Sequence, residues 1–223
     1  NPDWLLSFFN NPSIIRPNLQ VKMPSFHQIS DEEWDAIIAY FQHVDSENIN
    51  YRGIHQFDPE SMEFAAGAKL HEIGQCNSCH FYGEEFPTGD APTWAPNLAL
   101  TKERLNPGWV TEWLKNPGAI MPGTKMPAPY VPDSEILSME GAESDWGKAL
   151  VAIDGDTIAM LDGLRDYLWN IKGPTNIDAQ IKAYFAENGY DFDSESGDEY
   201  EDDDDSWDDD EDDWGDDDED EDW

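Results

Sequence analysis

The chain has 223 residues, of which 12 are Lys or Arg and 50 are Asp or Glu, so its formal net charge is −38. Residues 191–223 hold 23 of these acids and no base, which leaves a body with 27 acids and 12 bases, or −15. The body lacks the basic footprint that phosphate recognition requires, so we expect no nucleic-acid partner. Its apolar runs fall far short of the roughly 20 residues of a transmembrane helix, so we expect no membrane span.

Residues 1–50 predict two helices joined by a loop that contains a methionine. The first helix covers Pro2–Asn10, the loop covers Pro17–Pro24 and the second helix covers Asp31–Val44. Ser30 and Glu33 form a capping box at the start of the second helix, because each can bond the backbone N–H of the other. Apolar residues recur along this helix at helical spacing, at Trp34, Ile37, Ile38 and Phe41.

A third helix is predicted over Ser61–His71, with Ser61 as its N-cap. Gly67 lies in the middle of this helix, where Gly is about 1 kcal/mol less favourable than Ala. Its presence indicates close approach by another helix. Three later segments complete an all-α prediction: Pro107–Asn116, Thr157–Ile171 and Asn176–Asn188.

Both cysteines of the chain lie in the pentapeptide Cys76-Asn77-Ser78-Cys79-His80. C-x-x-C-H is the signature of covalent c-type haem attachment: thiols one helical turn apart can each reach a vinyl group of one porphyrin, and the next residue presents its imidazole to the iron. A redox dithiol or half of a zinc site are the alternatives. A structural zinc site would need a second ligand pair and a thioredoxin-like dithiol would follow a strand in a βαβ pattern, and the sequence shows neither.

These motifs together resemble a class I cytochrome c domain over residues 51–172. The resemblance rests on the short helix, C-x-x-C-H, the loop Ala95-Pro96-Asn97-Leu98 and the later Lys125-Met126-Pro127. It implies a haem c held by Cys76 and Cys79, with His80 as an axial ligand whose N–H bonds the carbonyl of Pro96.

The resemblance also implies contacts further along the chain. The helix at 157–171 would cross the helix of Gly67, with Tyr167 or Leu168 as the partner of this glycine. Arg104 would either bind a haem propionate or be an ordinary surface residue. Trp109 and Trp113 are four residues apart and share one helix face, which we expect to lie against the haem or the core.

An internal repeat selects the second axial ligand. Asn1-Pro2-Asp3-Trp4 recurs as Asn106-Pro107-Gly108-Trp109, and Asn11-Pro12 recurs as Asn116-Pro117 at the same offset. Lys22-Met23-Pro24 then matches Lys125-Met126-Pro127 after a two-residue insertion. Because Met126 matches a methionine whereas Met121 matches Arg16, we predict Met126 as the ligand. Met139 is an alternative, and Met160 is expected in the core.

The same repeat identifies residues 1–50 as the distal half of a second cytochrome c-like domain. Three interpretations of Met23 stay open. The N-terminus is incomplete and Met23 ligates a second haem, or the missing half belongs to another polypeptide, or Met23 packs in a haemless half-domain. The chain begins at Asn1 without a basic or apolar leader, which fits a removed targeting segment or an incomplete N-terminus.

Two segments follow residue 172. We expect residues 173–190 to form a C-terminal helix that clamps the body or a neighbouring subunit. Residues 191–223 form an acidic low-complexity tail that like-charge repulsion should keep extended, although Trp207, Trp214 and Trp223 interrupt it. Docking onto a basic partner, plain solvation and cation binding are the three interpretations of this tail.

The function predicted from these features is single-electron transfer rather than enzymatic catalysis. Met/His ligation raises the reduction potential relative to two histidines and leaves no iron position for oxygen. Covalent haem attachment indicates the periplasm or another extracytoplasmic face of a membrane, with respiratory-complex subunits or other redox proteins as partners. The alternative is a peroxidase-like haem oxidoreductase subunit whose iron is open.

Overall fold

The computed structural model describes residues 1–17, 23–45, 55–132, 145–153 and 155–189. Within these residues the chain forms nine α-helices and no β-strand, which confirms the all-α prediction for this part of the chain. None of these helices is long and apolar enough to cross a membrane. Met139 and the acidic segment 191–223 lie outside the described residues.

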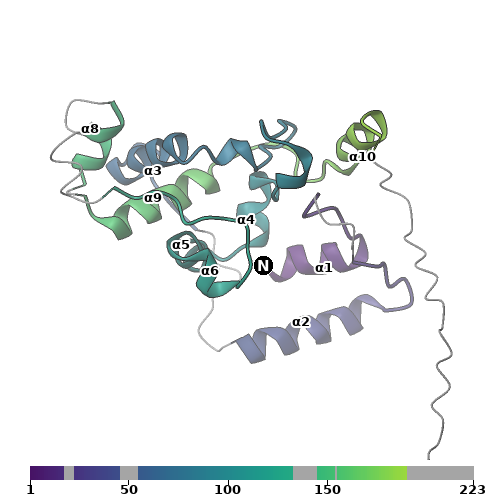
Figure 1. Cartoon of the computed structure of the whole chain (residues 1–223). Helices are drawn as coiled ribbons and strands as arrows, with labels where there is room; N and C mark the ends of the chain where they lie inside the picture. Colours follow the sequence, from purple (N-terminus) through teal and green to yellow (C-terminus); the bar gives the residue numbers. More distant parts are fainter. Residues whose placement is uncertain (18–22, 46–54, 133–144, 154, 190–223) are drawn as a thin grey trace, which may run out of the picture.

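The helices follow one another in the order shown in Figure 1, and all six predicted helices are among them. Their bounds are α1 Pro2–Asn10, α2 Asp31–Asp45, α3 Met62–Ile73, α4 Thr101–Arg104, α5 Pro107–Lys115, α6 Pro117–Ile120, α8 Asp145–Val151, α9 Thr157–Trp169 and α10 Asp178–Glu187. Three short 3-10 turns lie between α3 and α4, over Cys76–Ser78, Ala91–Thr93 and Leu98–Leu100.

The expected helix caps are present. The Ser61 hydroxyl accepts the N–H of Phe64 at the start of α3. At the start of α2, the N–H of Ser30 donates to the Glu33 carboxylate at 2.9 Å, and the N–H of Glu33 donates back to the Ser30 hydroxyl at 3.3 Å. Each cap satisfies backbone donors that the first helical turn leaves without partners.

Helices α3 and α9 lie side by side and cross at two glycines (Figure 1). A Cβ atom built on Gly67 would stand 2.0 Å from the carbonyl carbon of Gly163, and one built on Gly163 would stand 1.8 Å from the carbonyl oxygen of Glu63. The close approach predicted for Gly67 is therefore confirmed. Its predicted partner is wrong: Gly163 occupies the crossing, whereas Tyr167 lies one turn further along α9.

The main hydrophobic core surrounds this crossing. Met160 is fully buried there, as expected, together with Leu150 of α8, which the sequence analysis did not predict. The other buried side chains of this core come from α3, α5 and α9 and the segment after α8: Ala66, Leu70, Val110, Leu114, Ile153, Leu161, Leu164, Leu168 and Trp169.

Two smaller clusters lie outside the main core. Ile177, Ile181 and Phe185 at α10 pack against Phe81 and Trp94, so α10 clamps the body of its own chain, one of the two alternatives that the sequence left open. A third cluster joins α1 to α2 through the rings of Phe9 and Trp34, which stack with centroids 4.4 Å apart.

The internal repeat is visible in the local structure of α1 and α5. Both helices have nine residues and begin with an asparagine N-cap, Asn1 or Asn106, whose side chain accepts a backbone N–H two residues on. Both end at an asparagine with nearly the same backbone angles, φ −145°, ψ 80° at Asn11 and φ −156°, ψ 80° at Asn116.

The aromatic pairs of the two repeats are also equivalent. Trp4 and Phe8 stack with centroids 4.9 Å apart and ring planes at 14°. Trp109 and Trp113, at the matching positions, stack with centroids 5.2 Å apart and planes at 14°. The repeat therefore preserves side-chain geometry as well as sequence.

Polar contacts tie the first repeat to the rest of the chain. The amino group of Asn1 donates to the carbonyl of Arg104 at 3.2 Å, and the Arg104 guanidinium lies 5.4 Å from the ring centroid of Trp4. The N–H of Ile14 donates to the carboxylate of Asp178 at 3.0 Å. The α1–α2 pair is thus bonded both to α4 and to α10.

Candidate functional site

The C-x-x-C-H pentapeptide folds into one tight turn directly after α3. Gln75 takes a left-handed conformation, with φ 48°, and redirects the chain after the helix ends. The N–H of His80 then donates to the carbonyl of Cys76 at 3.0 Å. Cys76 and Cys79 are free thiols, both half-buried, and burial raises the pKa of the Cys76 thiol. The turn therefore presents two thiols and an imidazole from five consecutive residues.

The imidazole of His80 is fixed by the loop that the sequence analysis singled out. Its Nδ1 lies 2.7 Å from the carbonyl oxygen of Pro96. Since a carbonyl can only accept, Nδ1 carries the proton and Nε2 keeps its lone pair for a ligand. The predicted His80–Pro96 hydrogen bond is thus confirmed. A backbone bond from Ala95 to Cys79, at 2.7 Å, pairs the loop with the turn.

The protonation state of His80 suits metal ligation. Burial lowers the pKa of its imidazole, and the hydrogen bond to Pro96 offsets only part of this effect. A histidine whose pKa lies below about 6.5 is neutral at pH 7. Neutral imidazole is the form that binds metals.

Asn97 holds the loop in place, a role that the sequence analysis missed. Its buried side-chain amide donates to the carbonyls of Gly83 (3.2 Å) and Pro174 (3.1 Å). Its oxygen accepts the N–H groups of Gly83 and Ala99, at 3.0 and 3.1 Å. One side chain therefore links the loop to the chain after His80 and to the segment that leads into α10. In the sequence, the only indication of this role is that Asn97 directly follows Pro96.

Met126 is held by α5. The indole N–H of Trp113 donates to the thioether sulfur of Met126 at 2.8 Å, and the backbone N–H of Met126 donates to the hydroxyl of Thr124 at 3.3 Å. Met126 is half-buried against the main core, whereas Met121 is 39% exposed. Met126, the methionine predicted from the repeat, is thus the one of the two whose sulfur accepts a recorded hydrogen bond.

A second histidine lies near the turn. His71, on the last turn of α3, bonds the hydroxyl of Tyr82 through Nε2, and its ring packs on Tyr167 with centroids 4.6 Å apart. Burial lowers the pKa of His71 and raises the pKa of Tyr82. His71 is therefore a neutral imidazole and Tyr82 a protonated phenol. Their hydrogen bond joins α3 to the chain after His80, and the His71 ring also contacts α9.

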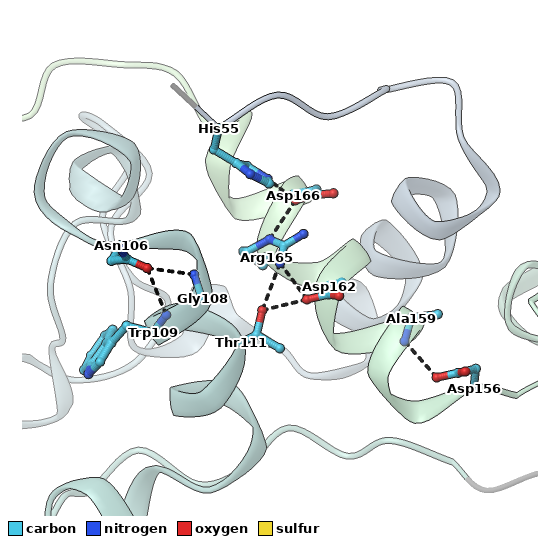
Figure 2. A network of polar contacts seen from close by, with 10 residues as sticks. All are labelled: His55, Asn106, Gly108, Trp109, Thr111, Asp156, Ala159, Asp162, Arg165 and Asp166. Atoms are coloured by element: carbon cyan, nitrogen blue, oxygen red, sulfur yellow. Dashed lines mark hydrogen bonds and ion pairs between the residues drawn. The ribbon is translucent and has the colours of Figure 1, made fainter. Parts of the chain in front are cut away.

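A charged network fixes α5 against α9, as Figure 2 shows. Arg165 donates to the carboxylates of Asp162 at 2.6 Å and Asp166 at 2.8 Å. Thr111 of α5 donates to Asp162 at 2.7 Å, and His55 lies 2.6 Å from Asp166. Because α5 carries Trp113, the network also supports the position of Met126. These contacts join residues up to 111 positions apart, so no local sequence pattern predicts them.

The remaining predicted site residues make their recorded contacts with other parts of the chain. Arg104 is half-buried over Trp4, at the contact between α4 and α1. Trp109 is 39% exposed and stacks on Trp113, so it belongs to the Met126 group. Met23 packs against the α1–α2 cluster. The structure thus unites Cys76, Cys79, His80 and Pro96 in one group and Trp109, Trp113 and Met126 in a second.

The donor set fits a haem c better than a bare metal ion. The two thiols and the neutral imidazole of the turn, with its free Nε2, are groups that attach and ligate such a haem, and the thioether of the second group is a further type of haem ligand. Among the described residues no three His, Cys, Asp or Glu side chains converge as ligands of a metal ion. Comparisons of the chain with protein-family models, curated proteins and solved structures give no match.

Proposed function

We propose that the chain is a class I c-type cytochrome that carries single electrons between redox partners. The observation that carries this proposal is the bond from His80 Nδ1 to the Pro96 carbonyl, made from within a C-x-x-C-H turn. It fixes the tautomer and orientation that an iron-ligating imidazole needs.

The residues that would hold the haem are those of the two groups described above. Cys76 and Cys79 would form the thioether links, His80 would ligate the iron through Nε2, and Met126 would ligate it through sulfur. The bound haem would supply the one-electron chemistry. The chain would supply burial, fixed ligand orientation and, through Trp113, a hydrogen bond to the methionine sulfur.

The partners we propose follow from the chemistry and the charge. Haem c is attached outside the cytoplasm, so we place the protein in the periplasm or on another extracytoplasmic face. A body of net charge −15 favours docking to basic surfaces of redox proteins or respiratory-complex subunits, because opposite charges speed encounter. The protein would be a carrier in such a chain and not itself the enzyme.

The alkaline pyridine haemochrome spectrum tests the cofactor. We expect a c-type band that remains with the polypeptide after acid-acetone extraction, because the haem is covalently linked. Cys76→Ser with Cys79→Ser should abolish the band. A protein that shows no c-type band, and binds zinc instead, would refute the proposal.

Ligation by Met126 is tested with paired methionine variants. Met126→Ala should abolish the thioether–iron charge-transfer band of the oxidised protein and allow carbon monoxide to bind the reduced iron, because the sixth position opens. Met121→Ala should keep the band and exclude carbon monoxide. Circular dichroism of both variants controls for folding. Carbon monoxide binding by the unmodified protein would instead support the open-iron oxidoreductase.

A further inference from the structure

Helix α9 connects the two groups of the proposed haem site. Helix α3 leads into the C-x-x-C-H turn and crosses α9 at Gly67 and Gly163. Helix α5 also packs on α9, and it holds Met126 through the indole of Trp113. The position of Met126 relative to His80 therefore depends on how α5 is fixed to α9.

Arg165 lies at the centre of the polar contact between α5 and α9 (Figure 2). Its Nη1 donates to the hydroxyl of Thr111 at 3.1 Å and to the carboxylate of Asp162 at 2.6 Å. Its Nε donates to Asp166 at 2.8 Å. The Thr111 hydroxyl donates its own proton to Asp162 at 2.7 Å, so these three residues close a ring of hydrogen bonds. Within the described residues, both polar contacts recorded between α5 and α9 pass through Thr111.

The ring is shielded from water and its bonds are directional. The side chains of Arg165 and Asp166 are 14% and 15% exposed, and Thr111 is buried. A buried ion pair adds little net stability compared with apolar side chains of the same volume, because desolvation offsets the attraction. Its hydrogen bonds do require defined distances and angles. The ring therefore favours one height and one rotation of α5 on α9.

The same helix carries the donor that holds Met126. Thr111 and Trp113 are two residues apart on α5, so a displacement of α5 at Thr111 also moves the indole. Among the described residues, Met126 has two recorded hydrogen bonds, one from Trp113 to its sulfur and one to Thr124, two positions away in the same loop. The bond from Trp113 is thus the polar link between this loop and a helix.

We infer that Arg165 is a positioning residue that, through Thr111 and Trp113, holds Met126 on the proposed iron and keeps its sixth position closed to external ligands. The inference rests on the proposed function, since it assumes an iron between His80 and Met126. Ligating groups must be held within about 0.5 Å of their working geometry, so a small shift of α5 is sufficient to release the sulfur. Arg165 would then separate a closed electron carrier from the open-iron alternative.

The test measures imidazole binding to the oxidised full-length holoprotein. Apparent affinity increases in proportion to the fraction of molecules whose sixth position is open. Arg165→Met removes the guanidinium, so its dissociation constant for imidazole should be at least about tenfold lower, with a weaker thioether–iron charge-transfer band. Thr111→Val keeps the shape of the side chain and the ion pairs of Arg165 within α9, but removes both recorded bonds to α5. It should shift both readouts in the same direction, and it serves as the test if Arg165→Met does not fold.

Three further variants separate positioning from charge and from general stability. Arg165→Lys keeps the charge without the planar fork, so its affinity should lie between those of Arg165→Met and the unmodified protein. Lys182→Met removes a positive charge from an exposed position on α10 and should leave the dissociation constant within about twofold. Leu150→Ala removes a fully buried side chain of α8 from the main core. It should lower the urea midpoint without opening the iron.

Two outcomes would overturn the inference. One is a loss of stability in Arg165→Met and Thr111→Val with unchanged imidazole binding, since the ring would then have a structural role alone. The other is an equal gain of imidazole affinity in Leu150→Ala, because any loosening of the core would then open the iron. In both cases the unmodified protein keeps its c-type haemochrome band and its closed iron, so the proposed function stands. An unmodified protein without that band would refute the proposed function and this inference together.

Discussion

His71 shows how burial sets the charge of one residue. Its imidazole is enclosed by α3, Tyr82 and Tyr167, and burial is the largest cause that lowers its pKa. The nearby His80 lowers the pKa further, and Glu72 raises it by a smaller amount. The folded chain therefore holds His71 neutral at a pH where an exposed histidine would begin to take up a proton.

This shift predicts a pH dependence of stability. The unfolded His71 has a pKa of about 6.5, so as the pH falls below that value the unfolded chain binds a proton before the folded chain does. The free energy of unfolding must then decrease as the pH falls. His71→Gln removes this contribution, so its stability should fall less between pH 7.5 and 5.5, measured by urea unfolding. His27→Gln, at an exposed position, is the control, and an unchanged slope in His71→Gln would contradict the prediction.

The hydrogen bond from Trp113 to Met126 leads to a prediction about the reduction potential of the proposed haem. The Trp113 N–H donates to the Met126 sulfur and withdraws electron density from it, which would make the thioether a weaker donor to the oxidised iron of that haem. Trp113→Phe should therefore lower the reduction potential. A hydrogen bond worth roughly 1 kcal/mol sets an upper limit of about 40 mV for one electron.

Spectroelectrochemical titration measures this change, and the same helix offers a matched control. Trp109→Phe makes the identical substitution four residues earlier, at the stacked partner ring, and keeps the Trp113 donor. Its potential should stay near that of the unmodified protein. A potential that rises in Trp113→Phe, or that falls equally in both variants, would exclude this role of the indole.

At the level of elements, the crossing of α3 and α9 depends on the absence of two side chains. Gly→Ala in a helix is normally favourable by about 1 kcal/mol. At Gly67 the added methyl would overlap the backbone of Gly163, so the helices would have to separate. Gly67→Ala should therefore destabilise the fold by about 3 kcal/mol or more, as severe overpacking does.

Denaturant unfolding of Gly67→Ala and Gly108→Ala tests this prediction. A Cβ at Gly108 would meet nothing closer than the Asn106 side chain at 3.4 Å, and the repeat carries Asp3 at the equivalent position. Gly108→Ala should therefore be neutral or slightly stabilising. Equal stabilities of the two variants would show that α3 and α9 do not cross at this point.

The predictable elements were those whose signals are local. The capping box at Ser30, the N-cap at Ser61 and the proline at the start of α5 each lie within a few residues of the helix end they determine. The turn at His80 was equally clear, because its chemistry requires consecutive residues. The link between His80 and Pro96 came only from the family resemblance, since 16 residues separate them.

Contacts between distant residues were not predictable in the same way. The partner of Gly67 was misassigned by one helical turn, because Gly163, Tyr167 and Leu168 all lie on α9 and the sequence does not fix the height of the crossing. The network of Arg165, Thr111 and His55 requires knowing how α5 and α9 are arranged. Helix α8 was missed because its seven residues are too few to show a period.

Across the whole molecule, charge is divided between a moderately acidic body and residues 191–223. Removing those residues changes the formal charge from −38 to −15. A cationic ruthenium ammine should therefore reduce the full-length protein faster than the truncated one, with a steeper decrease as ionic strength rises. Stopped-flow measurement with an anionic reductant is the control, and the order of rates should reverse. Identical salt dependence in both chains would show that these residues do not contribute to encounter.

The clamp formed by α10 also determines where the acidic residues can act. Phe185 packs on the ring of Trp94, within the same cluster as Phe81, which directly follows His80. Asp191 follows the last residue of α10 by four positions, a reach of at most about 14 Å. The acidic residues therefore begin four positions after a helix that packs beside the C-x-x-C-H turn.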